Sequence, residues 1–136
     1  MRNKFSNNYP IINLYKKKSI TSKIVTQMLY GENFAILRRY GNWCKIKLHT
    51  DNYVGFIIGK KFAKLSKPTH KVSVLAANIY GKPSSKTKQN KKLTFSSKIH
   101  AKEKYGSFTK FENQWIRTKD LRPINYKDNN IFSKIN

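Results

Sequence analysis

The chain has 136 residues, of which 38% are hydrophobic and 13% aromatic, enough to form packed cores and to exclude global disorder. Its 29 Lys and Arg against 6 Asp and Glu give a formal charge of +23, which favours an anionic partner such as nucleic acid, anionic lipid or an acidic polymer. Lys outnumbers Arg 24 to 5, and Lys, Asn and Ile, which AT-rich codons encode, make up 52 residues, so genome composition is an alternative source of the charge.

Several kinds of segment are missing from the sequence. Residues 1–8 lack the apolar stretch of a secretory signal, and no segment has the length of a membrane span. Cys44 is the only cysteine, so neither an intrachain disulfide nor a cysteine-based zinc site is available. We therefore expect a cytoplasmic protein with no membrane span, with the cell envelope as the alternative location.

Short runs of alternating apolar and polar residues fill the first half of the chain. Such runs occur at 34–38, 45–48 and 53–57, separated by turns rich in Gly, Asn and Asp. Alternation over a few residues is typical of half-buried strands, and short strands at this spacing are typical of a small barrel or sandwich. The pattern predicts an all-β fold.

The same layout recurs 65 residues later. Without a gap, Met28–Ile46 aligns with Leu93–Phe111, and the turn glycine Gly41 falls on Gly106. Apolar phase, aromatic placement and turn position agree between the copies. A period this long indicates two tandem domains rather than a solenoid of short units.

This repeat divides the chain into five parts. Pro68 and its polar neighbours suit a linker between the copies, and the apolar residues near the C-terminus suit the start of an amphipathic helix. We expect an N-terminal arm at 1–9, a first barrel at 10–63, a linker at 64–71, a second barrel at 72–124, and at 125–136 a helical tail or the start of a further catalytic domain.

Three motifs of the first copy resemble the bacterial SH3 module. They are Leu29-Tyr30-Gly31-Glu32, Gly41-Asn42-Trp43 and Gly55-Phe56-Ile57, in the order and spacing of that module. From about residue 10 to 125 the chain also resembles the N-terminal region of NlpC-type cell-wall cysteine peptidases, through motifs such as 51–56, 68–72 and 80–83. The resemblance implies two tandem SH3-like small β-barrels.

That family cleaves γ-D-glutamyl bonds to a diamino acid in murein peptides with a cysteine nucleophile and a histidine base. In this chain no Cys-Ser-Gly or Cys-Gly-Gly segment follows the second module. The resemblance therefore implies a non-catalytic region that positions or selects murein peptides, with peptidoglycan or its peptides and a downstream peptidase domain as partners. A basic nucleic-acid-binding barrel and a stand-alone protein-binding adaptor remain the alternatives.

No residue of the chain is a convincing catalytic or metal-binding group. Cys44 follows Trp43 in a strand-like run, where no helix dipole or nearby His lowers a thiol pKa. His49, His70 and His100 show no metal-binding spacing. We expect no catalytic residue, no metal site and no cofactor.

The aromatic residues divide into a predicted core and a predicted ligand site. We expect the core to contain Trp43, Phe56, Phe34, Ile46, Trp115, Phe108 and Phe111, because small barrels fill their interiors with such side chains. Tyr53 is out of phase with Val54, and with Asp51 it matches cleft-lining positions of the family's first module. Both are our predicted ligand-binding residues, whereas a stacking surface for nucleic acid is the alternative role for Trp43, Tyr53, Phe56, Tyr105 and Trp115.

Overall fold

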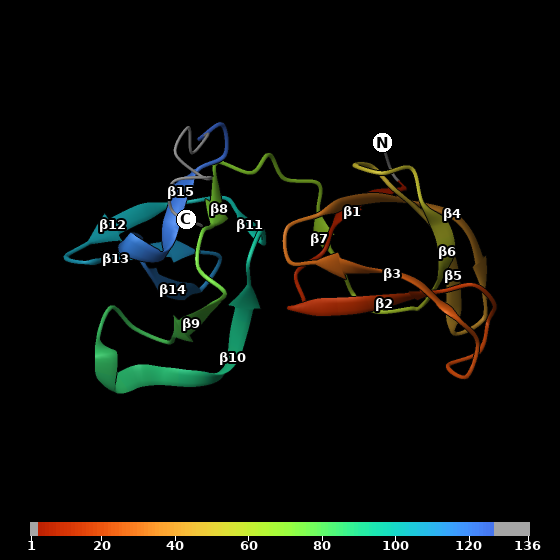
Figure 1. Ribbon diagram of the computed structural model, residues 1–136, viewed down its shortest axis with the longest axis horizontal. Coiled ribbons are helices and arrows are strands. Elements are labelled where there is room, and N and C mark those ends of the chain that lie inside the picture. Colours follow the sequence, from red (N-terminus) through yellow and green to blue (C-terminus); the bar gives the residue numbers. More distant parts are fainter. Residues whose placement is uncertain (1–2, 127–136) are drawn as a thin grey trace, which may run out of the picture.

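The computed structural model describes residues 3–126, which form two lobes built from strands (Figure 1). Within this range the only helical segments are two short 3-10 turns, Ser85–Thr87 and Thr118–Asp120. None of these helical turns has the length and hydropathy needed to span a membrane. The predicted all-β fold of two small barrels is confirmed. The predicted helical tail lies, from residue 127 onward, outside the described residues.

Barrel 1 is a single antiparallel sheet with the strand order β3-β2-β6-β5-β4-β1-β7. Alternate side chains of its strands point inward and form one core, as the period of a strand dictates. Its strands are β1 (Lys4–Ser6), β2 (Ile11–Tyr15), β3 (Ile24–Leu29), β4 (Asn33–Tyr40), β5 (Trp43–Leu48), β6 (Val54–Ile58) and β7 (Ala63–Lys64).

The N-terminal segment expected to be an arm contributes a strand to this sheet. Phe5 lies opposite Phe34 in the β1–β4 ladder, and their ring centroids are 6.1 Å apart. The prediction that residues 1–9 form a separate arm is therefore wrong for the described part of that segment. Burial of Phe5 against the barrel core stabilises β1 as part of the sheet. Burial against a distant strand leaves no local signal in residues 1–9.

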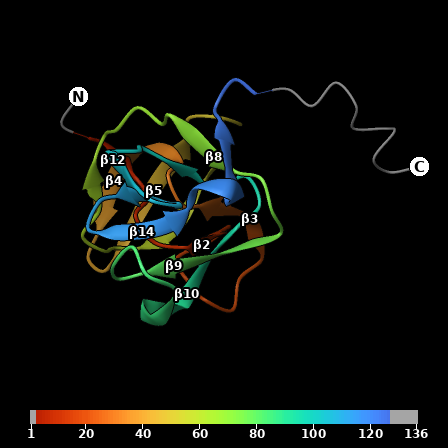
Figure 2. The same ribbon diagram turned by 90° about the vertical axis from the view of Figure 1, so that its left-hand side faces the viewer.

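Barrel 2 repeats this topology with one strand broken in two. Its sheets have the orders β10-β9-β14-β13-β12 and β11-β8-β15, so β12 and β11 together take the place of β4. Figure 2, turned by 90°, has this lobe toward the viewer. The strands are β8 (His70–Val72), β9 (Ala76–Tyr80), β10 (Lys88–Thr94), β11 (Lys98–Ile99), β12 (Glu103–Tyr105), β13 (Phe108–Phe111), β14 (Gln114–Arg117) and β15 (Leu121–Pro123).

Turn geometry also repeats between the two barrels. Gly41 and Gly106 both have positive φ, at 60° and 58°, in the two-residue turns that the 65-residue shift aligns. Positive φ costs little for glycine and more for other residues, so both copies keep glycine there. The duplication seen in the sequence is thus present in the backbone.

Four of the seven predicted core residues are buried, and three are not. Phe34, Ile46 and Phe111 belong to the core clusters and are at most 2% exposed, whereas Phe108, 7% exposed, is buried outside the barrel 2 cluster. Trp43, Phe56 and Trp115 are only half-buried, and the prediction that they belong to the core is wrong.

The reason for this error is strand phase. In β5 the inward positions are Cys44, Ile46 and Leu48, which places Trp43 on the outer face. Phe56 and Trp115 are likewise next to the inward Ile57 and Ile116. Ring size favoured the interior, but alternation decides the side of the sheet.

Candidate functional site

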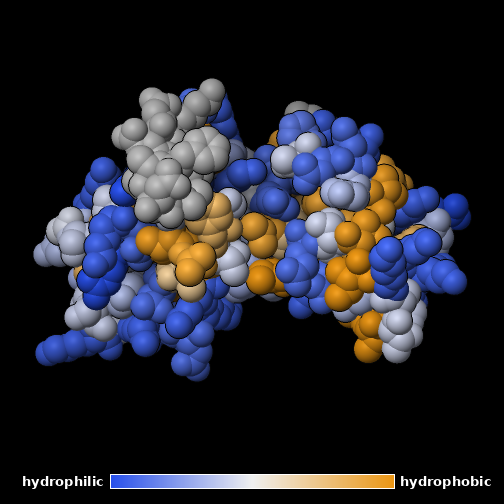
Figure 3. Space-filling model, in the orientation of Figure 1, coloured by the Kyte–Doolittle hydropathy of each residue, from blue (hydrophilic) through white to orange (hydrophobic). Residues whose placement is uncertain are grey.

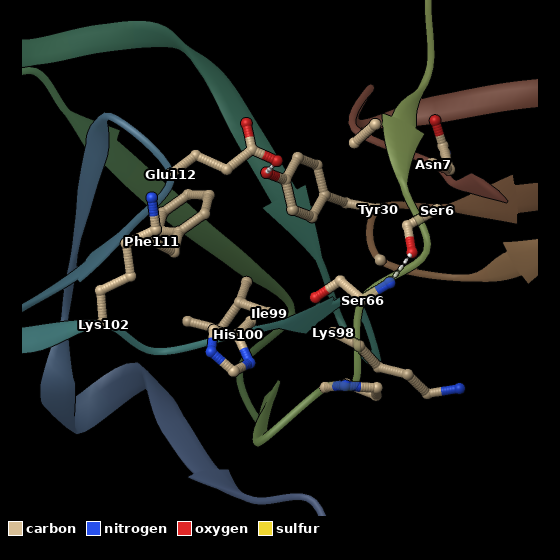
Figure 4. A pocket seen from close by; sticks show the side chains of 13 residues that line it. Ser6, Asn7, Tyr30, Ser66, Lys98, Ile99, His100, Lys102, Phe111 and Glu112 are labelled. Carbon is tan, nitrogen blue, oxygen red and sulfur yellow. Dashed lines mark hydrogen bonds between the residues drawn. The ribbon is translucent and has the colours of Figure 1, made fainter.

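The two barrels are joined by a tyrosine of barrel 1 that enters the core of barrel 2. Tyr30 follows β3 and is 6% exposed, within the cluster of buried residues that barrel 2 forms. Its ring meets Phe111 edge to face, with centroids 5.5 Å apart, and its hydroxyl donates a hydrogen bond to Glu112 at 2.5 Å (Figure 4). Burial raises the pKa of Tyr30, and the Glu112 carboxylate raises it further, so the phenol stays neutral.

A buried asparagine holds the turn that carries Tyr30. Asn7 is 1% exposed, and its Nδ2 donates to the carbonyls of Met28 at 3.2 Å and Leu29 at 3.0 Å. The Asn7 carbonyl accepts a hydrogen bond from the Gly31 amide at 2.7 Å. These bonds satisfy the backbone groups of the turn, which would otherwise be costly to bury.

Gly31 lets the second barrel approach this turn. It has φ +85°, and a Cβ at this position would lie 1.9 Å from the carbonyl oxygen of Lys98. The Lys98 amide donates to the Tyr30 carbonyl at 2.8 Å, so the barrels share a backbone hydrogen bond. Only glycine fits this contact without moving a backbone.

Barrel 2 accepts Tyr30 because its own hairpin is short. In barrel 1, Leu48 is 2% exposed and pairs with Phe34 inside the barrel. In barrel 2 the turn at 112–113 begins directly after Phe111, so no residue follows it in the place of Leu48. The Tyr30 ring packs on Phe111 and completes that core from the neighbouring barrel.

A cleft of about 200 Å³ lies along this joint. Tyr30 and Gly31 of barrel 1 line it together with Lys98, Lys102 and Glu112 of barrel 2 (Figure 4). Its ammonium groups outnumber its one carboxylate, which already accepts the Tyr30 hydrogen bond. The cleft is suited to a small group that carries a carboxylate.

The predicted ligand residues lie in the β5–β6 hairpin. Tyr53 is 46% exposed, and its carbonyl accepts the Leu48 amide at 2.9 Å, which fixes the backbone of the hairpin. Asp51 is exposed in the same turn. Neither residue lines the joint cleft, and both remain predictions as ligand contacts.

Glu32 connects this hairpin to the joint. Burial raises the pKa of the Glu32 carboxyl, and the nearby Asp51 carboxylate raises it further. The Leu29 amide, 3.2 Å from Glu32 Oε2, and the Lys98 ammonium both lower it. The His49 amide at the base of this hairpin donates to the carbonyl of Asn33, the residue after Glu32, at 3.0 Å, so the hairpin end of barrel 1 lies near the joint.

A second feature, which the sequence analysis missed, is an aromatic pair on the outer face of each barrel. Tyr15 and Trp43 meet edge to face in barrel 1, with centroids 5.9 Å apart. Tyr80 and Phe108 do the same in barrel 2 at 5.1 Å. The signal was available, because the 65-residue shift aligns both members of the two pairs.

The remaining reactive groups show no catalytic arrangement. Cys44 is 2% exposed in the core of barrel 1, and its nearest polar contact is Arg39 Nη1, 3.7 Å from Sγ. His70 and His100 contact Thr69 Oγ1 and the Lys67 carbonyl, and burial lowers the pKa of His70. Among residues 3–126, no three His, Cys, Asp or Glu side chains are grouped to hold a metal ion.

Comparison with known protein families finds a match within the first barrel. Residues 14–60 match the model of the bacterial dipeptidyl-peptidase SH3 domain. No curated protein sequence matches the chain significantly.

One solved structure extends the likeness in fold to the second barrel. The crystal structure of an NlpC/P60 family protein from Bacillus cereus ATCC 10987 overlays with a TM-score of 0.72 and 16% identity, over 93% of this chain. This chain covers 57% of that protein. NlpC2 from Trichomonas vaginalis overlays with a TM-score of 0.36 and 15% identity, over 91% of this chain and 47% of that one.

The expected resemblance to the SH3 modules of NlpC-type peptidases is confirmed. At this level of identity the structural likeness establishes the fold, whereas the domain match rests on the sequence itself. Residues 14–60 match a bacterial dipeptidyl-peptidase SH3 domain, and the chain as a whole shares the fold of part of an NlpC/P60 family protein.

Proposed function

We propose that this chain is a non-catalytic tandem SH3 region that selects murein peptides for a γ-D-glutamyl-diamino acid cysteine peptidase. The observation that supports this most directly is the match of residues 14–60 to the dipeptidyl-peptidase SH3 domain. The NlpC/P60 fold likeness extends it to both barrels. In this proposal, the peptidase chemistry belongs to a downstream domain.

The hairpin end of barrel 1 supplies the recognition groups. Asp51 offers an exposed carboxylate to an ammonium group, and Tyr53 offers a half-exposed ring beside it. Lys98 of barrel 2 lies across the joint, where its amide bonds the Tyr30 carbonyl, and its ammonium group can attract a peptide carboxylate. A murein peptide carries both ammonium and carboxylate groups, so opposite charges on the two barrels orient it.

The joint makes this arrangement effective. A ligand held by two separate barrels loses affinity when its two contacts move independently. Tyr30, Gly31 and the shared backbone hydrogen bond with Lys98 fix the barrels against one another. The two barrels are thereby held against one another before the peptide binds.

The test is an affinity measurement with murein tripeptide on the full chain. We expect weak binding without hydrolysis, and a loss of about twofold to fivefold for Asp51→Asn, the range of an exposed ion pair. Asp120→Asn, which neutralises an acidic residue of barrel 2, is the matched control and leaves the affinity unchanged. No binding at millimolar peptide, or equal effects of the two substitutions, contradicts the proposal.

A further inference from the structure

The outer aromatic pairs of the two barrels have the same geometry. The ring planes of Tyr15 and Trp43 meet at 82°, and those of Tyr80 and Phe108 meet at 76°. The strand ladders agree as well, because Phe56 lies opposite Tyr15 and Trp115 lies opposite Tyr80. Each barrel therefore carries two rings whose planes form a right-angled corner, called the notch below.

In barrel 2 an arginine closes this notch. Arg117 lies opposite Phe108 in the ladder, and its guanidinium carbon is 5.5 Å from the Tyr80 ring centre and 5.8 Å from that of Phe108. Its Nε donates to the Tyr80 hydroxyl at 3.0 Å. Under this cover, Tyr80 and Phe108 are only 2% and 7% exposed.

In barrel 1 the same position carries a residue that leaves the notch open. Ile58 lies opposite Trp43 in the ladder, as Arg117 lies opposite Phe108, and Ile58 is 42% exposed. Tyr15 and Trp43 accordingly stay half-buried. The polar contact of the Tyr15 hydroxyl is a marginal one with Asn13 Nδ2 at 3.5 Å.

The group that closes barrel 2 indicates what the open notch can hold. A guanidinium is flat and donates N–H groups along its edge. A peptide group is also flat and donates an N–H, so it can lie against the rings and donate to the Tyr15 hydroxyl. An extended peptide backbone thus matches both the shape and the hydrogen-bonding of Arg117.

The charged side chains near the notch determine which ligand charge it favours. Lys18 Nζ lies 4.2 Å from the ring centre of Tyr40, and Arg38 lies 5.0 Å from it. Lys45 flanks Phe56 on the neighbouring strand. Tyr40 is the ladder partner of Trp43, so these three cations lie near the notch and favour an anionic ligand.

No carboxylate of barrel 1 neutralises these cations in the part of the chain that the structure describes. Its two acidic residues, Glu32 and Asp51, lie at the hairpin end, where they interact with each other. β5 runs from Trp43 to that hairpin, which places the notch and the hairpin roughly 17 Å apart at 3.3 Å per residue. The notch is therefore a separate site from the one that Asp51 and Tyr53 would form.

We propose that the Tyr15–Trp43 notch of barrel 1 binds an extended acidic peptide, in addition to the proposed selection of murein peptides at the hairpin. A peptide group lies against the corner that the two rings form, and side-chain carboxylates pair with Lys18, Arg38 and Lys45. The geometry favours a peptide over single-stranded nucleic acid. Base stacking needs flat exposed rings, whereas these rings stand at right angles, and two cations already cover the Tyr40 ring.

The test uses the full chain and an acetylated hexapeptide of alternating Gly and Glu as the probe. The indole N–H signals of Trp43 and Trp115 in a two-dimensional NMR spectrum report the notch and barrel 2 separately. We expect the Trp43 signal to shift and saturate while the Trp115 signal stays in place. The Gly-Gln peptide of equal length, which has no side-chain charge, binds at least about tenfold more weakly if the cations contribute a typical 1.4 kcal/mol in total.

The decisive variant is Ile58→Arg, which copies the closed notch of barrel 2. This substitution adds positive charge, so the probe binds more tightly if its attraction to the chain is purely electrostatic. If the probe binds in the notch, the arginine occupies its place and the affinity falls. We expect a loss of at least tenfold in affinity. Leu75→Arg adds the same charge at a residue of barrel 2 that is 88% exposed, and leaves the affinity unchanged or slightly higher.

Three results overturn the proposal. These are an unshifted Trp43 signal, probe binding that Ile58→Arg strengthens, or tighter binding of an oligo-dT of equal charge at physiological salt. The last result assigns the notch to nucleic acid instead. Binding of murein tripeptide at the hairpin is measured separately, so failure of either site leaves the other one testable.

Discussion

Replacing Tyr30 by alanine removes the side chain that barrel 1 inserts into barrel 2. The ring is 6% exposed and packs on Phe111, so its loss leaves a cavity in the barrel 2 core. Truncation of a buried aromatic residue costs about 3–5 kcal/mol. A barrel of this size is marginally stable by itself, so we expect barrel 2 to unfold at much lower denaturant concentration.

Each barrel carries one tryptophan, which allows the two to be followed separately. Trp43→Phe leaves only Trp115 as the reporter of barrel 2, and Trp115→Phe leaves only Trp43 for barrel 1. In urea, with a slope of about 1–3 kcal/mol per molar for small proteins, the Trp115 transition shifts down by roughly 1–5 M. The Trp43 transition shifts less, because barrel 1 keeps its own core residue Leu48.

Phe95 provides the matched control for this experiment. It is the repeat equivalent of Tyr30, and its amide bonds the Leu75 carbonyl just as the Tyr30 amide bonds that of Pro10. Phe95 is 56% exposed, and Figure 3 shows apolar surface on both lobes of this face. We expect Phe95→Ala to change stability by no more than about 0.5 kcal/mol, as surface substitutions do. Equal destabilisation by the two alanine variants refutes the insertion of Tyr30 as a stabilising contact.

The remaining predictions concern the turn next to Tyr30. Gly31→Ala places a Cβ against the Lys98 carbonyl at positive φ, and we expect it to lower the melting temperature strongly. Gly41→Ala, which has open space around its Cβ, costs only about 1–2 kcal/mol of backbone strain. Similar losses of stability for both variants contradict the close approach of the barrels at Gly31. Because burial raises the pKa of Glu32 in the folded chain, the free energy of unfolding falls as pH rises above the ordinary value of about 4.3. Glu32→Gln removes this pH dependence, so in urea titrations the variant becomes more stable relative to the parent as pH rises toward neutral. A stability difference that does not change with pH contradicts the raised pKa of Glu32. Asn7→Ala leaves buried carbonyls without donors and destabilises the chain by about 1–3 kcal/mol in the same titration, and a neutral effect is the contrary outcome.

Alternation and turn glycines are local features, so they can be recognised in the sequence of both copies. The runs that they predict at 34–38, 45–48 and 53–57 correspond to β4, β5 and β6 in the structure. The short strand β1 could not be predicted in this way, because Phe5 is partly buried by Phe34, a residue far along the chain. Only the ladder shows that partnership.

The joint was likewise hidden from sequence reasoning. Tyr30 and Phe95 occupy equivalent positions, yet Tyr30 is buried by the other barrel and Phe95 is exposed. The difference arises because barrel 2 follows barrel 1 and lacks an equivalent of Leu48, so Tyr30 has a core to enter and Phe95 has none. The aromatic notch was missed for a simpler reason, since Trp43 was assigned to the core by its size.

The most direct test of the proposed function is a map of the NMR shifts that murein tripeptide causes in the full chain. The account predicts that the largest shifts cluster at Asp51, Tyr53 and, across the joint, Lys98, with smaller ones at Glu32. Shifts that leave these residues unchanged at millimolar tripeptide, or that spread evenly over exposed lysines, contradict the claim that the hairpin end of barrel 1 selects wall peptides.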